Sequence, residues 1–129
     1  LTQALPGMSL LFPGTHLRFL AKHDDERGWL MEMYRSDELP SGEFKLPEMG
    51  YISMTKPKVT RGPHEHLTQS DLFVFLGPSS FEVSLWDNRS DYPTYKQRQV
   101  FTTVPEHPFW LIVPPGVVHS YTNVGDEPG

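Results

Sequence analysis

The chain has 129 residues, a formal net charge of −5 and no cysteine, and it contains 10 glycines and 13 prolines. This length suits one domain with a proper core, and the lack of cysteine excludes a disulfide framework and a thiolate metal site. Acidic and basic residues are interspersed, which argues against a nucleic-acid-binding face, and no apolar run approaches the roughly 20 residues of a membrane span.

Short segments rich in Val, Ile, Phe, Trp and Tyr recur along the chain and are closed by turn residues, so we expect them to be strands. In chain order they are residues 16–20, 29–35, 50–54, 72–76, 81–86, 97–104, 109–113 and 117–122. Helical periodicity is almost absent, and residues 36–48 are expected to form a surface loop. Roughly eight short strands at this spacing predict an all-β jelly-roll or sandwich-like barrel.

The two ends of the chain bear on its domain organisation. The chain opens with Leu1 rather than Met and stops at Gly129 within a turn-like run. We therefore expect residues 1–129 to be a single domain that lacks a C-terminal tail of the longer protein. The absence of cysteine fits a reducing cytoplasm, where we expect the protein to reside.

Three histidines and one carboxylate are the candidate functional residues. His64 and His66 are two positions apart, so in a strand both side chains project from the same face. His119 and Tyr121 form another such pair, behind a turn that contains Gly116. An imidazole set of this kind serves two chemistries: proton abstraction next to a sugar ketone, and binding of a transition metal.

The spacing of these residues resembles the two motifs of the cupin superfamily. The positions that match the first motif are Gly62, His64, His66, Asp71 and Gly77. Those that match the second motif, Pro-x-Gly-x-x-His-x-x-x-Asn, are Pro114, Gly116, His119 and Asn123. Asp71 stands where cupins usually have Glu. The resemblance implies a cupin-type double-stranded β-helix, which is a jelly-roll barrel.

A narrower resemblance is to the dTDP-4-dehydrorhamnose 3,5-epimerase branch of that superfamily. Residues 25–34 look like the family's Arg-Gly-aromatic-x-x-Glu-x-Tyr/Phe strand, and residues 61–64 look like its Arg-Gly-x-His. Residues 86–95 look like its Asp-x-Arg-x-x-Ser-Pro-Thr-Phe segment, and residues 113–121 like its Ile-Pro-x-Gly-x-x-His-Gly-Phe. The matches are in order and extend from about residue 24 to the end of the chain.

The resemblance implies an isomerase that needs no cofactor and acts on a 4-keto-6-deoxy sugar nucleotide. In that family a histidine removes the protons at C3 and C5, and His64 matches it, with Arg61 near the developing enolate or the diphosphate. Arg27 and Glu32 match residues that reach the nucleotide in a neighbouring subunit, which implies a homodimer. His119 and Tyr121 would help to bind the sugar nucleotide. For Asp87 and Arg89 a turn with a surface ion pair is the favoured interpretation.

The chain also departs from the epimerase pattern. The family's enolate-stabilising lysine falls where this chain has Asp71, and the epimerase pattern does not require His66. Three alternatives therefore stay open. The first is a metal-dependent cupin that binds one divalent transition metal through His64, His66, Asp71 and His119. The second is a sugar-nucleotide 3,4-ketoisomerase that uses both His64 and His66, and the third is a cupin that binds a sugar nucleotide without turnover.

Overall fold

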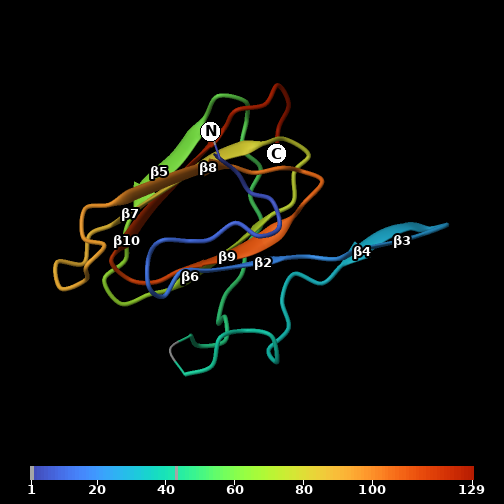
Figure 1. Cartoon of the computed structure of the whole chain (residues 1–129). Coiled ribbons are helices and arrows are strands. Elements are labelled where there is room, and N and C mark those ends of the chain that lie inside the picture. Colours follow the sequence, from blue (N-terminus) through green and yellow to red (C-terminus); the bar gives the residue numbers. More distant parts are fainter. Residues whose placement is uncertain (1, 43) are drawn as a thin grey trace.

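The computed structural model describes residues 2–42 and 44–129, and the described part of the chain is built from strands (Figure 1). The ten strands are β1 (Thr2–Gln3), β2 (His16–Phe19), β3 (Lys22–Asp25), β4 (Gly28–Met31), β5 (Thr60–His64), β6 (Asp71–Phe75), β7 (Phe81–Asp87), β8 (Arg98–Thr102), β9 (Phe109–Val113) and β10 (Val117–Asn123). Among the described residues no helix is long and apolar enough to cross a membrane.

Two sheets lie face to face and enclose the core (Figure 1). One has five strands in the order β1-β8-β7-β10-β5, and the other has three in the order β2-β9-β6. All of these pairings are antiparallel except that of β1 with β8. A two-layer antiparallel arrangement with strands that are distant in sequence lying side by side is a jelly roll, so the predicted all-β fold class is confirmed.

Alternating side chains on the central strands fill the space between the sheets. On β7, Phe81, Val83 and Leu85 point inward and are between 0 and 5% exposed. On β9 the inward positions are Phe109 and Leu111, which are 0 and 1% exposed. Each fully buried side chain of this size contributes about 1.5–3 kcal/mol, so this layer fixes how the two sheets lie against each other.

The main error in the predicted strands concerns residues 50–64. The strand expected at residues 50–54 is wrong, because that segment forms no ladder and Ile52 is 90% exposed. β5 was not predicted, since Gly62 and Pro63 are residues that usually interrupt strands. β5 is the edge strand of its sheet, and proline is tolerated at an edge because no neighbour needs its N–H.

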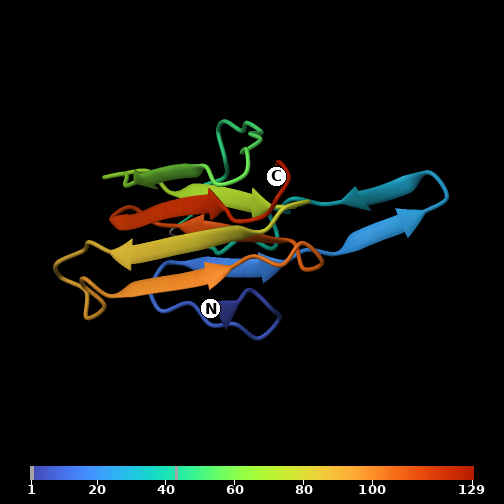
Figure 2. The same ribbon diagram turned by 90° about the horizontal axis from the view of Figure 1, so that it is seen from above.

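β3 and β4 form a hairpin that projects away from the barrel, as Figures 1 and 2 both show. The sequence predicted one strand at residues 29–35, whereas β4 ends at Met31 and pairs with the polar strand β3, which was not predicted. Trp29 and Leu30 on the hairpin are 56 and 63% exposed. The hairpin therefore carries apolar side chains that the barrel of the same chain does not cover.

Candidate functional site

The candidate site lies where β5, β6 and β10 bring their side chains together. His119 of β10 is paired in register with His64 of β5. Asp71 is the first residue of β6 in the opposite sheet and shares a face with Phe73, whose ring centroid is 5.1 Å from that of His119. The sequence thus predicted correctly that residues 55 positions apart in the chain would meet at one place.

The side chains of this site form a compact polar cluster. The ring centroid of His119 lies 6.2 Å from that of His64 and 5.9 Å from that of His66. Nε2 of His66 is 2.9 Å from Oδ2 of Asp71, and Nε2 of His119 is 3.4 Å from the same oxygen. Gln69 donates its side-chain amide to Oδ1 of Asp71 at 2.8 Å. Sequence analysis missed Gln69, although its position two residues before Asp71 is a signal for such a contact.

Backbone and side-chain contacts hold the segment that carries the two neighbouring histidines. The N–H of Gly116 donates to the carbonyl of His66 at 3.0 Å, and Asn88 donates its side-chain amide to both oxygens of Glu65 at 3.1 and 3.2 Å. Gly62 has a φ of +92°, and a Cβ there would lie 2.8 Å from the carbonyl oxygen of His119. Glycine therefore allows β5 to approach β10 closely just before His64.

The three imidazoles differ in burial. His119 is 5% exposed, and burial lowers its pKa against the opposing effects of the Val117 carbonyl and Asp71, so its ring is neutral at pH 7. The side chain of His66 is 37% exposed, and His64 is exposed. The rings of His64 and His66 are therefore accessible to a molecule that binds from solvent, whereas the ring of His119 is buried.

Tyr121 lies two residues after His119 on β10, and both rings contact Phe73. It is half-buried against Phe73 and Phe75, with ring centroids 5.8 and 5.5 Å away, and burial raises its pKa. Its hydroxyl therefore stays protonated at neutral pH and can donate a hydrogen bond. Tyr121 lies opposite Arg61 in the register of β10 and β5.

The guanidinium of Arg61 is held by its own chain. Nε donates to Oγ1 of Thr55 at 2.8 Å, and Nη2 donates to the carbonyl of Met54 at 2.9 Å. This contact ties the segment before β5 to the edge strand, which sequence analysis did not anticipate. The predicted position of Arg61 near an enolate or a diphosphate stays a prediction.

A metal ion could be held by part of the predicted ligand set. One ligand atom from each of His66, Asp71 and His119 can be chosen so that all lie within 4.8 Å of one another. His64, the fourth predicted ligand, is not a member of this group. Two imidazoles and one carboxylate fit a divalent transition metal, but His66 and Asp71 already form a hydrogen bond with each other.

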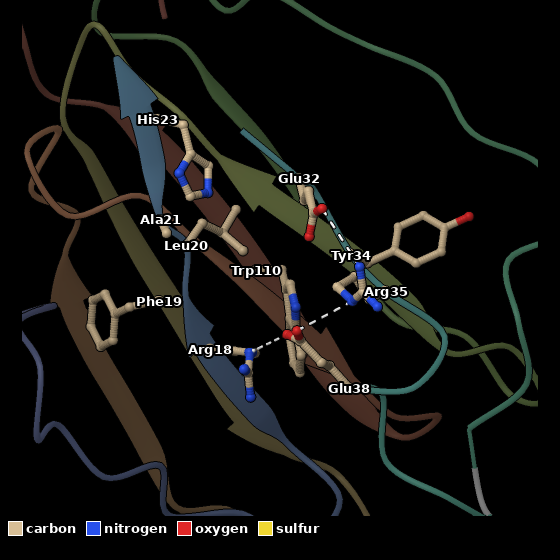
Figure 3. Close-up of a pocket in the computed structure, with 10 residues that line it drawn as sticks. All are labelled: Arg18, Phe19, Leu20, Ala21, His23, Glu32, Tyr34, Arg35, Glu38 and Trp110. Atoms are coloured by element: carbon tan, nitrogen blue, oxygen red, sulfur yellow. Dashed lines mark ion pairs between the residues drawn. The ribbon is translucent and has the colours of Figure 1, made fainter. Parts of the chain in front are cut away.

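Arg27 and Glu32, the predicted nucleotide-binding residues, lie away from the histidines. Arg27 is in the turn between β3 and β4 and pairs with Asp25 at 2.6 Å. Glu32 lines a separate cavity of about 230 Å³ beside β2 and Trp110, where it pairs with Arg35 at 3.6 Å (Figure 3). A single chain does not bring these two residues to the site.

Asp87 and Arg89 form the ion pair that the sequence favoured, although it is buried rather than on the surface. Asp87 is 0% exposed and accepts hydrogen bonds from Nε and Nη2 of Arg89 at 2.8 and 3.0 Å. Burial opposes ionisation, but these bonds and one from Thr94 lower the pKa of Asp87. The aliphatic part of Arg89 packs against Gly116, so this pair supports the turn before β10.

A family model described as dTDP-4-dehydrorhamnose 3,5-epimerase matches residues 10–128. The chain belongs to this family. The predicted resemblance is therefore confirmed, as is the enzyme class, an epimerase among the isomerases. Epimerases of this family are cofactor-independent.

Two relatives and one solved structure illustrate the likeness. The chain is 39% identical to Agl13, a probable low-salt glycan biosynthesis epimerase of Haloferax volcanii, over 87% of this chain and 70% of the relative. It is 32% identical to the spore coat polysaccharide biosynthesis protein SpsL of Bacillus subtilis, over 92% of this chain and 76% of that protein. A dTDP sugar isomerase from Desulfovibrio desulfuricans is 25% identical, with a TM-score of 0.79 over 93% of this chain and 76% of that one.

Proposed function

We propose that this member of the dTDP-4-dehydrorhamnose 3,5-epimerase family inverts carbons next to the ketone of a 4-keto-6-deoxy sugar carried on a nucleoside diphosphate, with His64 as a base. The ketone makes the protons on its neighbouring carbons acidic, and an imidazole is a suitable base at neutral pH. The observation that carries the proposal is that His64 is exposed beside the buried ring of His119, at 6.2 Å between centroids. A sugar ring could therefore lie over His119 and present its protons to His64.

Tyr121 supports a sugar-binding role for the same place. Its phenol stays protonated, and Phe73 and Phe75 form an apolar wall beside it. An apolar wall with a few fixed polar groups is typical of small-molecule sites. His119 and Tyr121 are therefore proposed as substrate-binding residues.

The test is deuterium incorporation into a dTDP-linked 4-keto-6-deoxy sugar in D₂O, followed by proton NMR. We expect deuterium at the carbons next to the ketone, with inverted configuration and the ketone still at C4. His64→Asn should lower this rate about 10²–10⁴-fold, which is the usual contribution of a general base. His16→Asn, at an exposed histidine of β2, is the matched control and should leave the rate unchanged. A native rate equal to that of His64→Asn would refute the proposal.

A 3,4-ketoisomerase is the second candidate, and one observation favours it. His66 and His64 lie at similar distances from His119, so two imidazoles face the same bound molecule. Two bases could move a proton between neighbouring carbons and thereby move the ketone. The same NMR experiment separates the candidates, because a ketoisomerase product carries its ketone at C3. A sample that binds the nucleotide sugar without any exchange would instead indicate a binding protein.

We propose that the enzyme acts as a homodimer in the cytoplasm, in which the hairpin of one copy completes the site of the other. Trp29 and Leu30 are exposed on the projecting hairpin, and covering them in a second copy would remove apolar surface from water. The side chain of Arg27 is 86% exposed on the same hairpin. In the dimer it would lie near the diphosphate of a sugar nucleotide bound to the other copy.

Mixing two inactive variants tests this assembly. Arg27→Ala removes the proposed hairpin contribution, and His64→Asn removes the proposed base. If each site combines the two residues from different copies, a re-equilibrated equimolar mixture should recover about one quarter of native activity, because half of the dimers are mixed and half of their sites are intact. No recovery, with native mass spectrometry that shows mixed dimers, would place both residues of a site on one chain.

A further inference from the structure

The chain leaves the sheet directly after the proposed base. His64 is the last residue of β5, and its backbone is paired in register with that of His119 on β10. Its ring lies edge-on to the ring of His119, with 6.2 Å between centroids. An exposed imidazole at the end of an edge strand takes its position from the backbone on both sides, and the ladder fixes only the side that precedes it. The contacts of the residues that follow His64 therefore help to determine where its ring lies.

The next residue is Glu65, and the side chain of Asn88 holds its carboxylate. Nδ2 of Asn88 donates to both oxygens of Glu65, at 3.2 Å to Oε1 and 3.1 Å to Oε2. Hydrogen bonds to a carboxylate are stronger than those between neutral groups. Consecutive residues of an extended chain project to opposite sides, so this contact fixes the backbone while the ring of His64 stays free to meet a bound molecule.

Asn88 is itself part of a well-anchored loop. The residue before it, Asp87, is 0% exposed and accepts two hydrogen bonds from Arg89, the residue after it. The N–H of Asn88 donates to the carbonyl of Gly116 at 2.9 Å, and the N–H of Gly116 donates to the carbonyl of His66 at 3.0 Å. The end of β7, the turn before β10 and the chain after β5 are therefore joined at one place.

We propose that Asn88 and Glu65 are positioning residues for the epimerisation, and that their contact sets the distance from His64 to the proton that it takes. This inference rests on the proposed function, in which His64 is a base. General-base catalysis requires the base to lie within hydrogen-bonding distance of that proton, and a misplacement of about 1 Å can lower the rate about 10²-fold. Asn88 and Glu65 act through the backbone of His64 and not on the substrate. Their loss should therefore lower kcat and leave KM nearly unchanged.

The test removes this contact in the full-length protein and then rebuilds it with donor and acceptor exchanged. Asn88→Ala should lower kcat for deuterium incorporation into a dTDP-linked 4-keto-6-deoxy sugar about 5- to 20-fold, with KM within about 2-fold of native. Asn88→Asp keeps the shape of the side chain but places a second carboxylate against that of Glu65, so the two repel each other and the loss should be larger. Combining Asn88→Asp with Glu65→Gln restores one donor and one acceptor of the original lengths. This double variant should return kcat to within about 2- to 3-fold of native, because the two substitutions act on one contact.

Thr60→Val is the matched control on the same strand. Thr60 is the first residue of β5 and also makes an exposed side-chain contact, between its Oγ1 and that of Thr122 at 2.6 Å. Removing this contact should leave kcat within about 2-fold of native, since sites roughly 13 Å apart along a strand act independently. Urea unfolding of every variant shows whether a change in kcat comes from a folded protein.

Three results would overturn the inference and leave the proposed function intact, because in each of them the native protein still exchanges protons. One is an Asn88→Ala variant whose kcat is native, whether or not its KM rises. Another is an Asn88→Asp variant that Glu65→Gln does not rescue. The third is an equal loss of kcat in Thr60→Val and Asn88→Ala, which would indicate that any loosening of β5 slows the reaction. Absence of exchange by the native protein would instead refute the proposed function, and the inference with it.

Discussion

Gly62 provides a direct test of how β5 and β10 bring His64 next to His119. Its φ of +92° disfavours any residue with a Cβ, and an alanine Cβ would lie 2.8 Å from the carbonyl oxygen of His119 and 3.1 Å from the amide nitrogen of His64. The left-handed conformation costs about 1–2 kcal/mol. Crowding against backbone atoms adds about 1–3 kcal/mol, because these atoms can move only if the strands separate. Gly62→Ala should therefore lose about 2–5 kcal/mol of the free energy of unfolding.

Gly7→Ala is a matched control that measures only the cost of the left-handed backbone conformation. Gly7 has a φ of +99°, and a Cβ there would meet nothing within 4 Å. This variant should lose only about 1–2 kcal/mol. Urea unfolding at pH 7 measures both changes, and deuterium exchange into the keto sugar should fall in Gly62→Ala and persist in Gly7→Ala. Equal losses of stability in the two variants would refute the argument that β5 must approach β10 closely at Gly62.

Three further predictions concern the core, a buried carboxylate and the site phenol. Leu111→Ala should lose about 2–5 kcal/mol of unfolding free energy in urea, because Leu111 is 1% exposed between the two sheets. Asp87→Asn should be destabilised at pH 7, and its deficit should shrink as the pH falls below about 4, because the lowered pKa of Asp87 contributes stability only above its unfolded value. Tyr121→Phe should weaken substrate binding about 3- to 10-fold by a constant factor between pH 6 and 9, since burial raises the pKa of the phenol and keeps it protonated.

The strands that were predicted correctly are those that can be recognised from their own residues alone. The inward side chains of β7 and β9 follow the alternation that any half-buried strand shows, and the bounds of Phe109–Val113 agree to the residue. Residues 50–54 have a strand-like composition and still form no strand, because a strand also requires a partner edge. β5 was missed for the converse reason. Its glycine and proline are acceptable only because it lies at the edge of the sheet, and a single sequence does not show where that edge is.

The candidate site shows the same division between local and non-local information. The motif around His119 and the spacing of His64 and His66 placed three histidines together, as found. Side-chain contacts such as those of the Arg61 guanidinium with Thr55 and Met54 were beyond the sequence. Such contacts depend on register and rotamer, which a motif does not encode. The predicted position of Arg61 near an enolate or a diphosphate stays a prediction.

At Asp71 the chain has a carboxylate where the family pattern has a lysine. The residues around Asp71 show how a carboxylate is accommodated there. A carboxylate in place of a cation beside a developing enolate raises the energy of the transition state if its charge faces the substrate. Here each oxygen of Asp71 has a hydrogen-bond partner, Oδ2 with His66 and Oδ1 with Gln69, and Nε2 of His119 lies 3.4 Å from Oδ2. Its negative charge therefore lies directly against two imidazoles and a side-chain amide.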